Sequence, residues 1–222
     1  MSRAVRDRID YRERGMRITG GVFRSRALAA PRGQDTRPTS DRVREALFSM
    51  LASDGAFAEE FGPRVLDLYA GSGALAFEAL SRGARAAVLV ESAKPAIAAI
   101  RENARALGVE DRITVVSARV ERALDVVEGP FDVILLDPPY AEVRARGFAD
   151  VLAKTARLLA ASGILVLEHA STDEPAPPPG VEVDRRRRHG DTTLSLFRTA
   201  HDDDDDASRS EEPNSAPEQA EQ

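Results

Sequence analysis

One stretch of the sequence has the pattern of a buried strand, a glycine-rich turn and the start of a helix: Val65-Leu66-Asp67-Leu68-Tyr69-Ala70-Gly71-Ser72-Gly73-Ala74. The apolar residues at its beginning predict a strand, and the residues after Gly73 predict a helix at 74–82. Gly71 and Gly73 allow the backbone to approach a ligand closely at the positive end of that helix. The stretch therefore predicts a ligand-binding turn at the carboxyl end of a strand.

The same alternation of strand and helix continues outward from this turn. Short runs of β-branched residues and leucine predict strands at 65–68, 87–90, 113–116, 131–136 and 164–168. Helical spacing predicts helices at 74–82, 93–107, 120–127 and 148–159. Runs that are continuously apolar indicate strands buried on both faces, as in a parallel sheet that is flanked by helices.

Two further strands are predicted after a proline-rich break at 175–180. The segments 181–186 and 192–198 are joined through His189-Gly190-Asp191, which is a hairpin signal. The sequence therefore predicts an α/β, Rossmann-like fold with a mainly parallel seven-stranded sheet and helices on both of its faces.

A small extension is predicted in front of this fold. Near-alternating apolar residues around Gly20-Gly21 favour a short hairpin with arginine on its open face. Thr39 or Ser40 can cap a helix whose apolar stripe begins at Val43. Two polar ends cannot bury apolar surface, and we expect them to be disordered. The expected organisation is a disordered N-terminus at 1–15, the extension at 16–60, the α/β domain at 61–199 and a disordered acidic tail at 200–222.

Composition excludes several classes of site. The 222 residues include no cysteine and 3 histidines, which excludes disulfides and thiolate nucleophiles and argues against a zinc site, so we expect no metal. No apolar run approaches a membrane span, and no signal peptide is visible, so we expect a cytoplasmic protein. A monomer is a separate expectation. The net charge of −6 hides an asymmetry. Residues 1–44 hold 12 arginines against 5 acidic residues, whereas residues 200–222 hold 9 acidic residues and 1 arginine, and the basic end indicates a polyanion partner.

Two acidic residues indicate which cofactor the glycine-rich turn binds. Asp67 precedes Gly71 by four residues, at the tip of the strand. A carboxylate there would repel a pyrophosphate, but it can accept a hydrogen bond from the ammonium group of S-adenosylmethionine. Glu91 ends the next strand, 18 residues after Gly73, where an acid can hold the two hydroxyl groups of a ribose. We therefore expect S-adenosylmethionine as the cofactor.

The motif Asp137-Pro138-Pro139-Tyr140 follows the fourth strand and indicates the chemistry. The prolines fix the backbone and remove donors, so that the Asp137 carboxylate and the Pro138 carbonyl remain as acceptors for one amino group. Tyr140 offers a ring on which a base that has left its own stack can stack in turn. No charged base is required, because the amine loses its proton after the attack, and positioning and desolvation provide most of the catalysis. We therefore expect a class I S-adenosylmethionine-dependent methyltransferase that acts on a base amino group.

Several blocks of the chain resemble the RsmD family, the bacterial 16S rRNA (guanine-N2) methyltransferases. The resemblance covers roughly residues 16–199 and rests on the blocks at 16–21, 36–48, 65–75, 80–84 and 137–140. It implies methylation of the position-966 guanine of 16S rRNA on a small-subunit assembly intermediate. One position departs from the common pattern, because Ser117-Ala118-Arg119 stands where many class I enzymes carry an acid that binds the adenine. Ser117 or a backbone carbonyl is expected to make that contact instead.

The expected site has three groups of residues. The catalytic group is Asp137, Pro138 and Tyr140. The cofactor group is Asp67, Tyr69, Gly71, Ser72, Gly73, Glu91 and Ser117. The RNA-binding group is Arg17, Arg24, Arg26, Arg37, Thr39, Ser40 and Arg42, with Arg44 beside them, because arginine forks and a free helix start suit phosphate oxygens.

Other functions remain open at this point. A DNA adenine or cytosine amino-methyltransferase would share these motifs, but 222 residues leave little room for its target-recognition domain. A glutamine-modifying protein methyltransferase typically begins the tetrapeptide with Asn. A non-catalytic RNA-binding ribosome assembly factor could keep the fold, and a nicotinamide dehydrogenase would leave Asp137 to Tyr140 unexplained.

Overall fold

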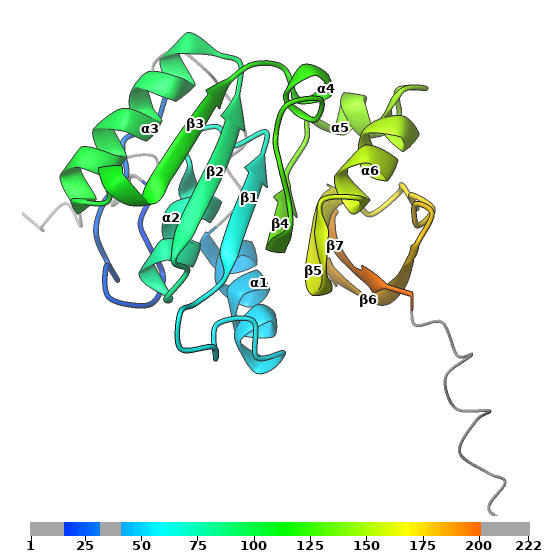
Figure 1. Ribbon diagram of the computed structural model, residues 1–222, viewed down its shortest axis with the longest axis horizontal. Helices are drawn as coiled ribbons and strands as arrows, with labels where there is room; N and C mark the ends of the chain where they lie inside the picture. Colours follow the sequence, from blue (N-terminus) through cyan, green and yellow to red (C-terminus); the bar gives the residue numbers. More distant parts are fainter. Residues whose placement is uncertain (1–15, 32–40, 201–222) are drawn as a thin grey trace, which may run out of the picture.

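The computed structural model describes residues 16–31 and 41–200. The expectations for the two chain ends, and for Arg37, Thr39 and Ser40, lie outside these residues. In the described part, a sheet carries helices on both faces (Figure 1). No helix there is long and apolar enough to cross a membrane.

The sheet has seven strands in the order β3-β2-β1-β4-β5-β7-β6. Its parallel strands are β1 (Arg64–Leu68), β2 (Ala86–Glu91), β3 (Ile113–Ser117), β4 (Phe131–Leu136) and β5 (Leu159–Ala170). The closing hairpin consists of β6 (Val181–His189) and β7 (Thr192–Thr199), and β7 is antiparallel to both of its neighbours. The predicted mainly parallel seven-stranded sheet is confirmed.

The helices divide between the two faces. One face is covered by α1 (Asp41–Ser53), α2 (Ala74–Ser81) and α3 (Lys94–Leu107), and the other by α4 (Val120–Ala123) and α6 (Phe148–Ala156). A short α5 (Tyr140–Val143) and a 3₁₀ turn (Glu110–Arg112) complete the list.

Alternate residues of the strands belong to two separate hydrophobic cores, one on each face of the sheet. Val65 and Val133 pack with α2 and α3, whereas Leu66 and Ile134 pack with α4 and α6. This division follows from the alternation of side chains along a strand, and it explains why the central strands read as continuous apolar runs.

Several elements differ from the predicted bounds. Helix α6 ends at Ala156 rather than 159, because β5 begins at Leu159, and β6 extends to His189 rather than 186. The strand β5 begins at Leu159 rather than 164, because Leu159 pairs with Phe131 ahead of a register shift. The continuous apolar run begins only after Gly163, so the sequence pattern does not reveal the first five residues of this strand. The helix α4 ends at Ala123 rather than 127, and α5 was not predicted, since four residues are too few to show a helical period.

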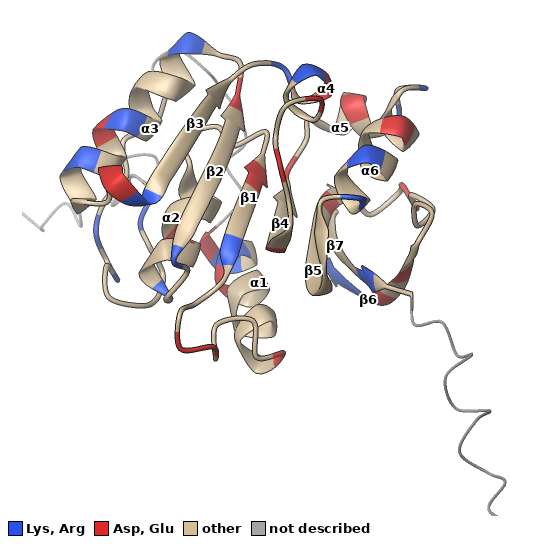
Figure 2. Ribbon diagram, in the orientation of Figure 1, with Lys and Arg blue, Asp and Glu red and all other residues tan. Residues whose placement is uncertain are grey.

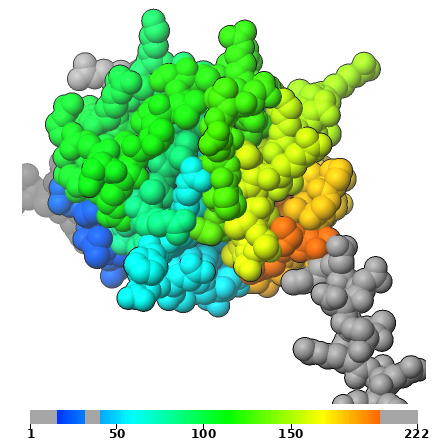
Figure 3. Space-filling view, in the orientation of Figure 1, coloured from blue at the N-terminus to red at the C-terminus, as the bar shows by residue number. Residues whose placement is uncertain are grey.

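The hairpin of the N-terminal extension packs on the face that α2 and α3 cover, on the opposite side of the molecule from β6 (Figure 3), whereas Asp54, after the end of α1, pairs with Arg185 of β6. The hairpin is short, with a single antiparallel bridge between Arg17 and Ala27. The backbone donors of Thr19 and Gly20 bond to the side chain of Glu78, and Val22 N–H donates to the carbonyl of Ser81. The ladder is therefore short because these donors are used to dock the hairpin on α2.

Candidate active site

Strand register brings the expected site residues to one edge of the sheet. Glu91 pairs with Ser117, and Leu68 lies between Val90 and Leu136. The ends of β3, β2, β1 and β4 are therefore neighbours, and the turns that follow them meet at this edge. In open α/β sheets, ligands bind at the carboxyl ends of the strands.

Asp67 is buried beneath the turn. Its Oδ2 accepts a hydrogen bond from the backbone N–H of Ala76, at 3.0 Å. The pKa of Asp67 is raised to about 8, mainly by burial; the Ala76 hydrogen bond lowers it, and the nearby carboxylates of Asp137 and Glu91 contribute to the rise. Three acidic residues thus lie near one another at the ends of three adjacent strands. Figure 2 shows acidic positions at the tips of β1 and β2.

This charge distribution favours a cationic ligand over a phosphate. A pyrophosphate would add negative charge beside the carboxylates of Asp137 and Glu91, which already disfavour the ionisation of Asp67. A ligand with an ammonium and a sulfonium group would offset that charge. The edge therefore fits S-adenosylmethionine better than a dinucleotide.

Glu91 connects the turn to the end of β2. Its Oε2 accepts from the N–H of Gly71 at 2.8 Å, and its Oε1 accepts from the N–H groups of Ser92 at 2.6 Å and Ala93 at 2.7 Å. A carboxylate offers about four acceptor positions, and three are used here. Two ribose hydroxyls could therefore bond to Glu91 only if at least one backbone donor moved away.

The two glycines of the turn have different surroundings. Both have positive φ, 54° at Gly71 and 80° at Gly73. A Cβ on Gly71 would meet nothing within 4 Å, whereas a Cβ on Gly73 would lie 2.7 Å from the ring of Phe77 and 2.9 Å from Leu89. Gly71 thus leaves room for a ligand, and Gly73 allows the helix to pack closely on β2.

The residues between the strand and Gly73 point to different parts of the fold. Tyr69 has a positive φ of 61° and packs on the side of α4. Its buried hydroxyl makes no hydrogen bond within the described residues, and burial raises its pKa to about 12, with Glu121 and Glu142 adding to the effect. Ser72 is buried, and its hydroxyl contacts Met16 Sδ at 3.6 Å.

The tetrapeptide at the end of β4 lies beside this turn. Asp137 is half-buried, Pro138 is buried, and Pro139 caps α5. Tyr140 opens α5, and its hydroxyl is 2.9 Å from the hydroxyl of Thr192 at the start of β7. This hydrogen bond joins α5 to the closing hairpin and restricts the ring.

Comparison with known proteins agrees with this geometry. The family described as Conserved hypothetical protein 95 matches residues 16–198. Ribosomal RNA small subunit methyltransferase D of Escherichia coli is 30% identical over 192 residues, which cover 86% of this chain and 94% of that protein. The chain belongs to the RsmD family.

Two further relatives support this assignment. The Bacillus subtilis protein YlbH, which carries the name of an rRNA methyltransferase, is 33% identical over 82% of this chain and 98% of its own. The solved structure of yhhF from Escherichia coli, described as a methyltransferase, is 30% identical with a TM-score of 0.70, over 83% of this chain and 97% of that one. The RsmD-family fold is therefore shared along nearly the whole length of these relatives.

One prediction for the basic N-terminal segment, residues 1–44 (the basic head), is wrong: the sequence places Arg44 beside the RNA-binding residues of this RsmD-family chain. Arg44 is fully buried rather than free for RNA, and it forms ion pairs with Asp41 at 2.7 Å and Glu78 at 3.5 Å. It also donates to the carbonyl of Arg17. Its neighbours on one helical face are apolar, which explains why an arginine there turns inward once a buried carboxylate is present to pair with it.

The other described head arginines are exposed. Arg17 donates to the carbonyl of Ser25 at 3.1 Å, and Arg26 donates to the carbonyl of Ala106 at 2.6 Å. Arg24 and Arg42 are exposed as well. All four side chains are accessible to solvent.

Two buried polar residues that sequence reasoning missed hold the extension on the domain. Glu78 accepts from the N–H and hydroxyl of Thr19, from the N–H of Gly20 and from Arg82. Asn103 exchanges two hydrogen bonds with the backbone of Ala29 and donates to the carbonyl of Ser72 at 3.0 Å. A glutamate inside the apolar helix Ala74–Ser81 was the available signal for Glu78. Asn103 gave no comparable signal.

Within the described residues, no group of three or more His, Cys, Asp or Glu side chains could hold a metal ion.

Proposed function

We propose that this chain transfers a methyl group from S-adenosylmethionine to the exocyclic N2 amino group of a guanine in 16S rRNA. The observation that carries the proposal is the position of Asp-Pro-Pro-Tyr at the end of β4, directly beside the acidic, glycine-rich turn after β1. Methylation of small-subunit rRNA is the activity that the name of the Escherichia coli relative states.

Asp67, Gly71 and Glu91 would hold the cofactor, with Tyr69, Ser72, Gly73 and Ser117 shaping its site. The bound cofactor supplies a methyl group on a positively charged sulfur. Asp67 accepts from the ammonium group, and the open face of Gly71 gives the ligand room. The unpaired Tyr69 hydroxyl is a donor that a ligand can use.

Asp137 and Pro138 would position the target amine. The carboxylate and the carbonyl would accept hydrogen bonds from its two N–H groups. These bonds would leave the nitrogen lone pair free to face the methyl group. The cofactor would supply the methyl group and leave as S-adenosylhomocysteine, and the surplus proton of the amine would leave to solvent. Tyr140 stacks on the extruded base while its hydroxyl stays bonded to Thr192.

The exposed arginines of the extension would hold phosphates of the RNA. Arg17, Arg24, Arg26 and Arg42 are solvent-exposed on the face that α2 and α3 cover. The resemblance to the family extends this proposal to the position-966 guanine, on an assembly intermediate of the small subunit. We also propose that the protein acts as a monomer.

A transfer assay with labelled cofactor tests the proposal. Wild-type protein should label rRNA in small subunits from cells that lack the protein, and it should not label DNA. Asp137→Ala should abolish the transfer and still bind S-adenosylhomocysteine in calorimetry. Wild-type turnover in Asp137→Ala would contradict the mechanism. Binding of NAD(H) without S-adenosylmethionine would contradict the cofactor, and cofactor binding without any transfer would favour an assembly factor.

A further inference from the structure

The closing hairpin carries a second basic surface that the extension does not account for. We propose that Arg187 and Arg188, on the edge strand β6, bind phosphates of the same RNA on the other side of the active site. This inference rests on the proposed function, because it assigns the partner to be RNA.

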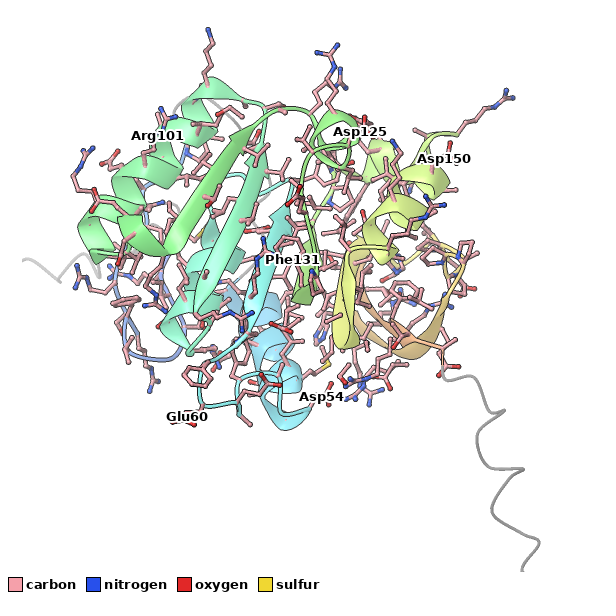
Figure 4. All side chains as sticks on the ribbon, viewed as in Figure 1. Asp54, Glu60, Arg101, Asp125, Phe131 and Asp150 are labelled. Atoms are coloured by element: carbon pink, nitrogen blue, oxygen red, sulfur yellow. The ribbon has the colours of Figure 1, made fainter. Side chains whose placement is uncertain are left out.

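The arginines of β6 fall into two groups with different partners. Arg185 pairs with Asp54 at 2.8 Å and with Asp184 at 2.9 Å, and Asp54 lies just after the end of α1 (Figure 4). Arg186 is partly buried and donates to the carbonyl of Pro175 at 3.0 Å. These two side chains are therefore used by the fold.

Arg187 and Arg188 are not used in this way. Both are exposed, and within the described part of the chain no carboxylate lies within ion-pair distance of either. Among the described residues, Arg187 donates one long hydrogen bond, to the carbonyl of Arg186 at 3.5 Å, and Arg188 donates through Nε to the carbonyl of Gly190 at 2.9 Å. The two side chains project to opposite faces of the edge strand, and each thus keeps most of its donors for a ligand.

The hairpin places these two arginines at the edge of the sheet where the site lies. β7 runs antiparallel to β5, so its first residue, Thr192, lies at the carboxyl edge. Thr192 pairs with His189 and holds the hydroxyl of Tyr140. With strands about 4.8 Å apart and a rise of about 3.4 Å per residue, Arg188 and Arg187 lie one and two residue steps from that pair. An arginine side chain there can reach a phosphate beside a base that is bound at Tyr140.

The chemistry of this surface suits a nucleic acid better than a protein. Protein interfaces depend on buried apolar or aromatic anchors. Among the described residues, the large apolar side chains that are strongly exposed are Val22, Phe61 and Val126, and none of them belongs to β6 or β7. Arginine forks match phosphate oxygens bidentately.

Salt dependence of binding tests the surface. The assay measures binding of the full chain to small ribosomal subunits from cells that lack the protein, over a series of salt concentrations. Arg187→Ala/Arg188→Ala should lower the log–log salt slope by roughly 0.7–0.9 for each lost phosphate contact. Cofactor affinity and the thermal midpoint should not change. Arg187→Lys/Arg188→Lys should restore the slope, because it keeps the charges.

The control variant is Arg105→Ala/Arg157→Ala, which removes two exposed arginines from α3 and the end of α6 and should leave the slope as in the wild type. An unchanged slope in the β6 variant, with normal methylation by the wild type, would overturn the surface and leave the proposed function intact. Weaker binding to subunits but not to their deproteinised RNA would also overturn it, since a protein contact would then be responsible. Absence of rRNA methylation by the wild type would instead refute the proposed function.

Discussion

At the residue scale, the protonation of Asp67 affects both the stability of the fold and the binding of the ligand. A buried carboxyl group with a pKa of about 8, raised from 3.8, keeps its proton at neutral pH in the free protein. Between those two values the unfolded chain is ionised at this position while the folded protein is not. The free energy of unfolding therefore falls as the pH rises through this window, and an ammonium partner would reverse the effect.

Calorimetry in buffers of different ionisation enthalpy checks this link. S-adenosylhomocysteine carries the same ammonium group as the cofactor, and its binding at pH 7 should release close to one proton from Asp67. Asp67→Asn should bind without that release and should be more stable than the wild type at pH 7. Equal proton release by both proteins would show that Asp67 does not meet the ammonium group.

Tyr140 has two separable roles, stacking on the base and bonding to Thr192. Tyr140→Ala should weaken capture of the base by about 1–3 kcal/mol, the usual contribution of one stacking contact. Tyr140→Phe and Thr192→Val each remove only the hydrogen bond, and each should weaken capture of the base by about 1 kcal/mol. Single-turnover kinetics measures all three. A Tyr140→Phe variant as impaired as Tyr140→Ala would argue against stacking as the main role.

At the element scale, Glu78 is the group that joins the extension to α2. It is fully buried and bonds to Thr19, Gly20 and Arg82, with Arg44 also beside it. Glu78→Gln should destabilise the protein by about 3–5 kcal/mol, because it leaves buried positive charge without its partner. Denaturant unfolding measures this loss, and Glu45→Gln, an exposed change on α1, is the control. Similar stabilities for the two variants would mean that the pair contributes little.

The same scale shows what could be predicted from the sequence and what could not. The central strands and the turn at Gly71 were predictable because apolar runs and glycines report local requirements. The sequence pattern places Arg44 among the RNA-binding residues. Its buried partner Glu78 lies 34 residues away in the sequence, and no local pattern indicates a pairing over that distance. The core-facing role of Gly73 was equally hidden, since it depends on Phe77 and Leu89 across the turn.

At the scale of the whole molecule, charge is divided between a basic head and an acidic tail. Residues 200–222 carry 9 acidic residues and 1 arginine, and this charge opposes the approach of RNA. A chain that ends at Thr199 should associate with small subunits equally fast or faster at low salt, and the difference should vanish at high salt. Stopped-flow association measures the rate. Slower association of the shortened chain would show that the tail takes part in binding.

The central claim is that one guanine amino group of 16S rRNA receives the methyl group. Mapping of modified nucleotides in 16S rRNA, from cells with and without this protein, tests it most directly. We predict a single N2-methylguanosine that is present with the wild-type protein and absent both without it and with Asp137→Ala. An identical set of modified nucleotides in all three would contradict the account.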